Sequence, residues 1–283
     1  MRFRPAALAA ALVLATAALP VSPASAARID PGTSPAINWA PVESATIYPG
    51  IGTEAAGAGC TANFVYTDRD QNVYIGQAAH CTSAEGSPLS GSGCASPSQP
   101  LGTRVSLGSS GASGELVYSS WLAMQKVGET DEITCLSNDF ALIRIPAEAV
   151  AKVNPSVPLF GGPVGVIDNG GLPAGEPVYG YGASGLRGGI ETPQQGFSLG
   201  TEPPGWYHLV YLLPPGVPGD SGGGLMDSRG RAAGVLISLN TLPPGTNGLT
   251  DLARALAYAQ QHSGLKGLTL VPGTEAFTGG LVG

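Results

Sequence analysis

The sequence predicts an all-β protein that ends in one helix. Glycine (43 residues) and proline (25 residues) are abundant, while charged residues make up only 12% of the 283 residues. This balance favours strands and turns over long helices. Short apolar segments alternate with turn-forming stretches along most of the chain, and only residues 250–264 have the spacing of an amphipathic helix. Many short strands followed by one terminal helix are typical of a β-barrel architecture.

Residues 1–26 have the features of a signal peptide. Arg2 and Arg4 precede an apolar run at residues 6–19, and the small residues that follow fit a signal-peptidase site. A membrane anchor is the alternative, but the run is short for a spanning helix and prolines close it. We therefore expect a secreted protein with no membrane association after cleavage. Residues 27–44 would form a polar lead-in that contains proline.

The body of the chain contains a series of short strand patterns. A β-hairpin is expected at residues 61–76, where the turn DRDQN separates two apolar segments. Residues 83–115 are rich in serine and glycine and predict a long irregular excursion, while MDSRGRA has the composition of a hairpin turn. The remaining strand candidates are residues 139–146, 176–182, 206–215 and 231–240.

The expected helix has recognisable start and stop signals. Thr250 or Asp251 can cap its N-terminus, and Gly264 can end it. An apolar stripe recurs at helical spacing between these ends, at Leu252, Ala255, Leu256 and Ala259. The folded domain is thus expected over residues 45–263, with a C-terminal tail at residues 264–283.

Net charge excludes two classes of partner. The formal charge is −7, and the chain has no basic run. Loss of residues 1–26 removes two arginines and no acid, which makes the mature charge −9. A chain this acidic has no electrostatic reason to bind nucleic acid or an anionic membrane.

The four cysteines are an even set in an exported chain, which favours disulfides. Four cysteines allow three pairings. Metal binding is the competing interpretation, but the chain has no close C-x-x-C spacing and only three histidines. We therefore expect no metal site.

Three motifs carry side chains that suit nucleophilic catalysis. His80 stands in QAAHC, Asp139 in SNDFALI at the head of an apolar strand, and Ser221 in PGDSGGG. A hydroxyl is a poor nucleophile at neutral pH and needs a general base. Imidazole suits this role because its pKa lies near working pH, and a carboxylate can fix its tautomer and stabilise its charged form.

The order His, Asp, Ser with AAHC, NDFALI and GDSGG resembles the chymotrypsin-like serine proteases, especially small secreted bacterial members, over roughly residues 45–262. The resemblance implies two six-stranded antiparallel β-barrels with a catalytic triad in the cleft between them. It makes His80 the base, Asp139 its orienting partner and Ser221 the nucleophile. The backbone N–H groups of Gly219 and Ser221 would form the oxyanion hole.

The same resemblance assigns a substrate pocket. Pro215, six residues before Ser221, would lie at its base, where an acid in this family selects Lys or Arg. No acid occurs between Glu202 and Asp220, so we expect an uncharged residue such as Leu, Phe, Tyr or Ala before the scissile bond. The cysteine pair that commonly braces this pocket is missing.

The segment GVLISLN resembles the family strand that pairs with the substrate backbone. This similarity would place Ser238 near Asp139. Leu239 and Asn240 would then line the cleft and contact substrate.

Two supporting features also follow from the resemblance. Some bacterial members neutralise the acid before the nucleophile, here Asp220, with an internal arginine, for which Arg187 is a candidate. The expected disulfides are Cys60–Cys81, which would hold the His80 loop, and Cys94–Cys135.

We therefore expect a secreted, monomeric serine endopeptidase that cleaves protein or peptide substrates through an acyl-enzyme without metal or cofactor. Two alternatives stay open. One is a catalytically inactive homologue that serves as a binding module. The other is an esterase of the α/β-hydrolase type, because GDSGG also fits G-x-S-x-G, with Asp227 or Asp251 and then His262 following Ser221.

Overall fold

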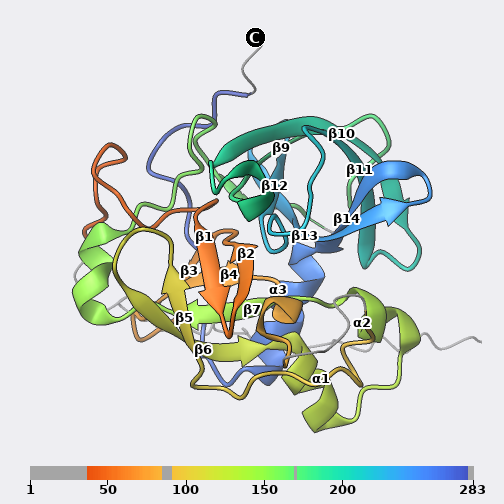
Figure 1. Cartoon of the computed structure of the whole chain (residues 1–283), viewed down its shortest axis with the longest axis horizontal. Coiled ribbons are helices and arrows are strands. Elements are labelled where there is room, and N and C mark those ends of the chain that lie inside the picture. Colours follow the sequence, from red (N-terminus) through yellow and green to blue (C-terminus); the bar gives the residue numbers. More distant parts are fainter. Residues whose placement is uncertain (1–36, 85–90, 169–170, 280–283) are drawn as a thin grey trace, which may run out of the picture. The chain divides into compact units, whose positions relative to one another are not determined.

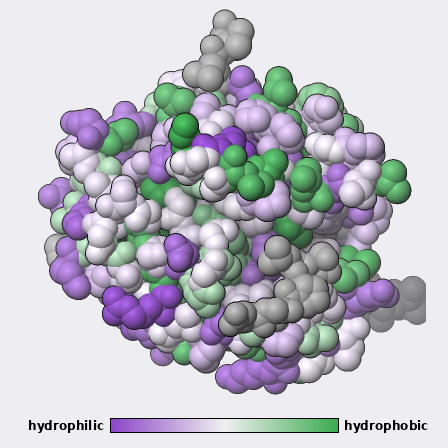
Figure 2. Space-filling model, in the orientation of Figure 1, coloured by the Kyte–Doolittle hydropathy of each residue, from purple (hydrophilic) through white to green (hydrophobic). Residues whose placement is uncertain are grey.

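A computed structural model describes residues 37–84, 91–168 and 171–279, which form two antiparallel sheets with few helices (Figure 1). The expected signal peptide and the first part of the lead-in lie outside the described residues. Within the described ranges, no helix has the length and apolar character needed to cross a membrane. On the face in Figure 2, strongly polar and strongly apolar residues are scattered among weakly polar ones, as 12% charged residues would give.

The first sheet has eight strands in the order β15-β3-β4-β7-β6-β5-β1-β2. The expected hairpin is confirmed, with Tyr66 opposite Tyr74 in the β3–β4 register. A fully buried cluster that includes Ile75, Leu116 and Ile143 forms its core. The strands are β1 Gly52–Ala55, β2 Ala58–Thr61, β3 Val65–Thr67, β4 Val73–Gln77, β5 Arg104–Leu107, β6 Ser113–Ser119, β7 Ala141–Arg144 and β15 Thr269–Leu270.

The second sheet closes into a six-stranded antiparallel barrel. Strand β12 pairs with both β9 and β13, so the order β12-β9-β10-β11-β14-β13 returns to its start, and β8 adds a parallel edge. Residues alternate along β11, where Val210 and Leu212 are buried and Tyr211 and Leu213 are exposed. The strands are β8 Gly165–Val166, β9 Pro177–Gly182, β10 Thr192–Glu202, β11 Tyr207–Leu213, β12 Gly224–Asp227, β13 Arg231–Thr241 and β14 Pro244–Asp251.

The all-β class is confirmed, but the strand count of the first sheet differs from the expected six. The chain end, expected as a tail, supplies β15, which pairs with β3. Leu268 is buried beside it, and the Gly162 N–H donates to the Glu275 carbonyl at 2.9 Å. A two-residue strand has no period for a sequence pattern to detect. In the described residues no pairing joins the outermost strands, β15 and β2, of this sheet.

Of the three α-helices in the described residues, only one was expected. Helix α3 (Leu252–His262) begins where Asp251 accepts a hydrogen bond from the Arg254 N–H at 2.8 Å, which confirms Asp251 as its cap. Helices α1 (Ser120–Val127) and α2 (Glu132–Ser137) are short, and tertiary packing of buried side chains such as Trp121 stabilises α1. Short 3-10 helices also occur between these elements, at η1 Ala79–Thr82, η2 Ala147–Lys152 and η3 Gly185–Arg187.

Residues 83–115, expected as an irregular excursion, contain β5 and the start of β6. The disulfides join Cys60 to Cys81 and Cys94 to Cys135, as expected from the resemblance. The first ties β2 to η1, and the second ties the serine- and glycine-rich segment to α2. The first disulfide thus holds the chain next to His80, and the second holds the chain just before Asp139.

Candidate active site

Strand register brings His80 and Asp139 together. Strand β4 ends at Gln77, which lies opposite Ala141 at the start of β7. Because the strands are antiparallel, the chain that leaves β4 runs beside the chain that enters β7. His80, three residues after Gln77, therefore meets Asp139, two residues before Ala141. Asp139 Oδ2 lies 2.6 Å from His80 Nδ1, and Asp139 Oδ1 accepts the His80 backbone N–H at 2.9 Å.

This pair is buried, with His80 4% and Asp139 5% exposed. Burial alone would lower the pKa of His80 because it disfavours the imidazolium, but the charge of Asp139 and its hydrogen bond raise that pKa above its ordinary value of 6.5. A carboxylate only accepts, so Nδ1 carries the proton that bonds to Asp139. The other ring nitrogen, Nε2, is then left as the basic atom, and in the described residues it has no hydrogen-bond partner.

The loop that contains Ser221 is held by residues of the first sheet and of the segment that follows β2. Thr61 donates its N–H to the Ser221 carbonyl and its hydroxyl to the Gly219 carbonyl, both at 2.8 Å. Asn63 Nδ2 donates to the Gly222 carbonyl at 3.0 Å. Gly222 has a φ of +91°, a conformation that favours glycine, and a side chain there would collide with the Thr61 carbonyl. The loop is thus fixed against β2 and the segment that follows it.

Two backbone N–H groups of this loop donate no hydrogen bond within the described ranges. The Pro218 carbonyl accepts from Ser184 Oγ at 2.6 Å, and the Asp220 carbonyl accepts from the Gly223 N–H at 3.0 Å. Each peptide plane is therefore anchored on its carbonyl side, and its N–H points the opposite way. Those N–H groups belong to Gly219 and Ser221, and neither donates to any acceptor within the described ranges. They can serve as oxyanion donors.

The acid before the candidate nucleophile is neutralised inside the molecule. Asp220 is fully buried, and Arg187 forms an ion pair with its Oδ1. Gln194 Nε2 and the Val217 N–H donate to Oδ2 at 3.1 and 3.0 Å. The expected role of Arg187 in binding Asp220 is confirmed, and the charge that would otherwise be buried alone has a partner.

A pocket of about 280 Å³ contains both His80 and Ser221. No hydrogen bond joins these two side chains in the described residues, an arrangement common in substrate-free sites. The other lining residues are Gly216, Val217, Pro218, Leu236, Ile237, Ser238 and Leu239. A larger cavity of about 620 Å³ lies over β5–β7 and includes none of the candidate site residues.

Two of the four expected substrate-pocket residues, Pro215 and Asn240, are not among the residues that line this pocket. Pro215 is exposed and lies outside the pocket lining, where Gly216 is the first residue that faces inward. Asn240 is also outside it, since its amide bonds to the Tyr207 hydroxyl at 3.1 Å. Ser238 lines the pocket, and its hydroxyl bonds to Tyr207 and Asn240.

The sheet has a local irregularity beside Ser238. The β13–β14 register shifts between Leu236 and Ser238, and a bulge reverses which side chains face a given direction. A simple count along the sequence does not contain this shift. Leu239, like Ser238, lines the pocket.

A buried amide joins the walls of this pocket. Asn247 on β14 is fully buried and accepts the Gly216 N–H at 2.9 Å through Oδ1. Its Nδ2 donates to the carbonyls of Gly216 at 2.9 Å and Ser238 at 3.0 Å. Asn247 therefore links the two walls. Sequence reasoning missed it, because an asparagine within a strand carries no catalytic motif.

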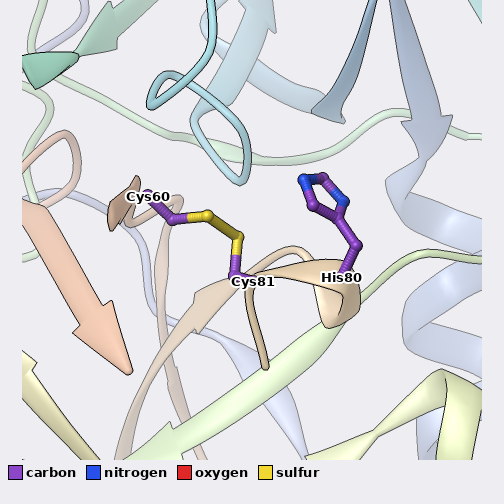
Figure 3. Close-up of side chains that lie close together, drawn as sticks. All are labelled: Cys60, His80 and Cys81. Atoms are coloured by element: carbon purple, nitrogen blue, oxygen red, sulfur yellow. A yellow bond between two sulfur atoms is a disulfide. The ribbon is translucent and has the colours of Figure 1, made fainter. Parts of the chain in front are cut away.

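His80 also lies near a disulfide. Ligand atoms of Cys60, His80 and Cys81 lie within 4.8 Å of one another, and Figure 3 shows the imidazole beside the bonded sulfurs. Both sulfurs are used in the Cys60–Cys81 bond, so neither is a thiolate that could ligate zinc.

The remaining histidines do not form a second catalytic site. His262 packs against Tyr258 with ring centroids 4.3 Å apart and the rings tilted by 38°. The candidate acid Asp251 instead faces His208, with Oδ2 3.0 Å from Nε2. The segment after Ser221 enters strand β12 rather than a helix. The strand–turn–helix geometry of an α/β-hydrolase elbow is therefore absent at Ser221.

Comparison with known proteins gives matches among solved structures alone. No protein-family model matches the chain, and no curated protein matches its sequence. Similar structures include Thermobifida fusca Protease A (18% identity, 80% of this chain and 99% of the other, TM-score 0.47) and Cellulomonas bogoriensis chymotrypsin (18%, 80% and 98%, TM-score 0.46). A Nocardiopsis protease matches at 18% identity over 79% of this chain and 98% of its own, with a TM-score of 0.46. These structures are chymotrypsin-like serine proteases of bacteria, the class that the motifs resemble.

Proposed function

We propose that the protein is a secreted chymotrypsin-like serine endopeptidase. The observation that carries this proposal is the joint placement of a buried His80–Asp139 pair, Ser221 in the same pocket, and two backbone N–H groups with no acceptor among the described residues. The predicted signal peptide and the two disulfides support an exported enzyme. We expect it to act as a monomer.

The proposed reaction uses these groups in sequence. Ser221 Oγ attacks the carbonyl carbon of the scissile peptide while His80 Nε2 takes its proton. The oxyanion accepts hydrogen bonds from the Gly219 and Ser221 N–H groups. His80 then protonates the leaving amine, and the C–N bond breaks to give an acyl-enzyme. Water, deprotonated by His80, hydrolyses the ester and restores Ser221.

Reaction with a fluorophosphonate probe tests this function. The wild-type protein should form a covalent adduct that peptide mass spectrometry locates at Ser221, because the probe needs an activated serine and an oxyanion site. Hydrolysis of a denatured protein substrate should accompany labelling. An intact, folded protein that neither reacts nor cleaves would instead be the inactive homologue that serves as a binding module.

The pocket supports a preference for uncharged side chains. Its lining contains no carboxylate, so a lysine or arginine before the scissile bond would lose its hydration without gaining a charge partner. We expect selection for Leu, Phe, Tyr or Ala at that position in a peptide library analysed by mass spectrometry. Strong selection for Lys or Arg would contradict this assignment.

A further inference from the structure

A second pocket lies on the other side of the Ser221 loop. It has a volume of about 280 Å³ and includes Gly219, whose N–H is one of the candidate oxyanion donors. The first pocket includes Pro218 and Ser221. Residues of the loop that carries Ser221 thus line both pockets, and a polypeptide bound across Ser221 would reach both.

The second pocket is lined almost entirely by small residues, and its one charged residue is Glu54. Its other members are Gly52, Thr53, Gly59, Cys60, Ser106, Gly108, Ala183, Gly185 and Gly219. Glu54 on β1 lies directly opposite Gly59 on β2. A side chain at Gly59 or Gly185 would meet no atom within 4 Å, so the space beside Glu54 is open.

The Glu54 carboxylate has no partner of its own. Its side chain is exposed, and in residues 37–84, 91–168 and 171–279 it makes no hydrogen bond or ion pair. Ser106 Oγ donates to the backbone carbonyl of Glu54 at 3.2 Å and not to its carboxylate. A single free carboxylate in a pocket without bulky side chains suits the long stem and charged end of lysine or arginine.

We propose that Glu54 selects a basic residue on the leaving-group side of the scissile bond. This inference rests on the proposed function, under which the pocket beside β13 takes the residue before that bond. The second pocket then takes one of the first residues after it. The enzyme would thus combine an uncharged preference on one side of the cleaved bond with a basic preference on the other.

Matched peptides test this proposal. Internally quenched peptides with Leu before the scissile bond and Lys, Gln or Glu at each of the next two positions are compared by kcat/KM. The wild type should prefer Lys over Gln by about two- to fivefold at one of these positions, the size expected for an exposed ion pair. The preference should shrink at 0.5 M salt, because salt screens exposed charges.

Variants separate charge recognition from a structural effect. Glu54→Gln should remove the preference for Lys, and Glu54→Lys should reverse it toward Glu. Neither variant should change kcat/KM on an acyl p-nitroanilide, which has no residue after the cleaved bond. Glu148→Gln, the same change at an exposed acid on η2, should keep the wild-type preference.

The outcomes distinguish the two proposals. Cleavage of all the peptides at equal rates, or a lysine preference that survives in Glu54→Gln, would overturn the role of Glu54 and leave the protease assignment standing. A folded wild-type protein that neither cleaves a peptide nor reacts with the fluorophosphonate would overturn the proposed function, and this inference with it.

Discussion

Ser221→Ala should abolish peptide hydrolysis, with kcat lower by about 10⁶-fold, because the residues of such a triad act as a unit and loss of the nucleophile removes the covalent route. The free energy of unfolding should not change. The Ser221 hydroxyl makes no hydrogen bond in the part of the chain that the structure describes, whereas its carbonyl, which the variant keeps, accepts from Thr61.

Peptide cleavage and fluorophosphonate labelling measure this effect, with thermal unfolding as the check on folding. Ser228→Ala is the matched control, since Ser228 lies in the exposed β12–β13 turn and bonds to Glu176. It should label and cleave like the wild type. Full cleavage by purified Ser221→Ala would refute the assignment of the nucleophile.

Sequence patterns located the three motifs of the candidate site because each motif is local. The hairpin before His80, the apolar strand after Asp139 and the glycine loop around Ser221 are short motifs whose geometry depends on a few neighbouring residues. The structure brings His80 and Asp139 to 2.6 Å through the β4–β7 register. The family resemblance implied that meeting. Neither motif alone contains it, because register is a property of two strands.

The supporting residues could not be found in this way. Ser184 anchors the peptide plane that presents the Gly219 N–H, and Asn247 joins the two pocket walls. Each acts through side-chain hydrogen bonds to backbone groups that are distant in sequence. Ser184 and Asn247 have no pattern around them that predicts such a partner. Arg187 could be named only because the family resemblance includes members that neutralise this acid, here Asp220, with an internal arginine.

The substrate-pocket residues are harder to place from the sequence for a different reason. Pro215 was placed by counting back from Ser221, and Ser238 was placed from a strand motif. Both placements assume that no residue is inserted in the loop and that side chains alternate regularly along the strand. The register shift between Leu236 and Ser238 breaks that alternation, and the turn before Gly216 directs Pro215 to solvent. Catalytic motifs tolerate few insertions, whereas pocket walls vary, so the triad positions are the more transferable part of a resemblance.

Asp139→Asn should lower kcat by about 10⁴-fold while the protein stays folded. The amide can occupy the same space, but it cannot hold the imidazole with its proton on Nδ1 and its basic Nε2 toward the pocket as a carboxylate does. The variant also loses the charge that stabilises imidazolium during proton transfer. Asp168→Asn, at an exposed acid that pairs with Arg231, is the matched control and should retain full activity.

The pH dependence of Asp139→Asn separates an electrostatic role from a purely structural one. In the wild type the neutral imidazole is the base, so kcat/KM is highest above the raised pKa of His80 and falls as pH drops through it. In Asp139→Asn the charge that raises this pKa is gone while burial, which lowers it, remains. The acid limb of the profile should therefore move to lower pH, even though the plateau is far lower. Measurement of kcat/KM from pH 4 to pH 9 for both proteins decides the point: an acid limb at the wild-type position would mean that the charge of Asp139 does not set the pKa of the base, and the buried pair would then serve only to position His80.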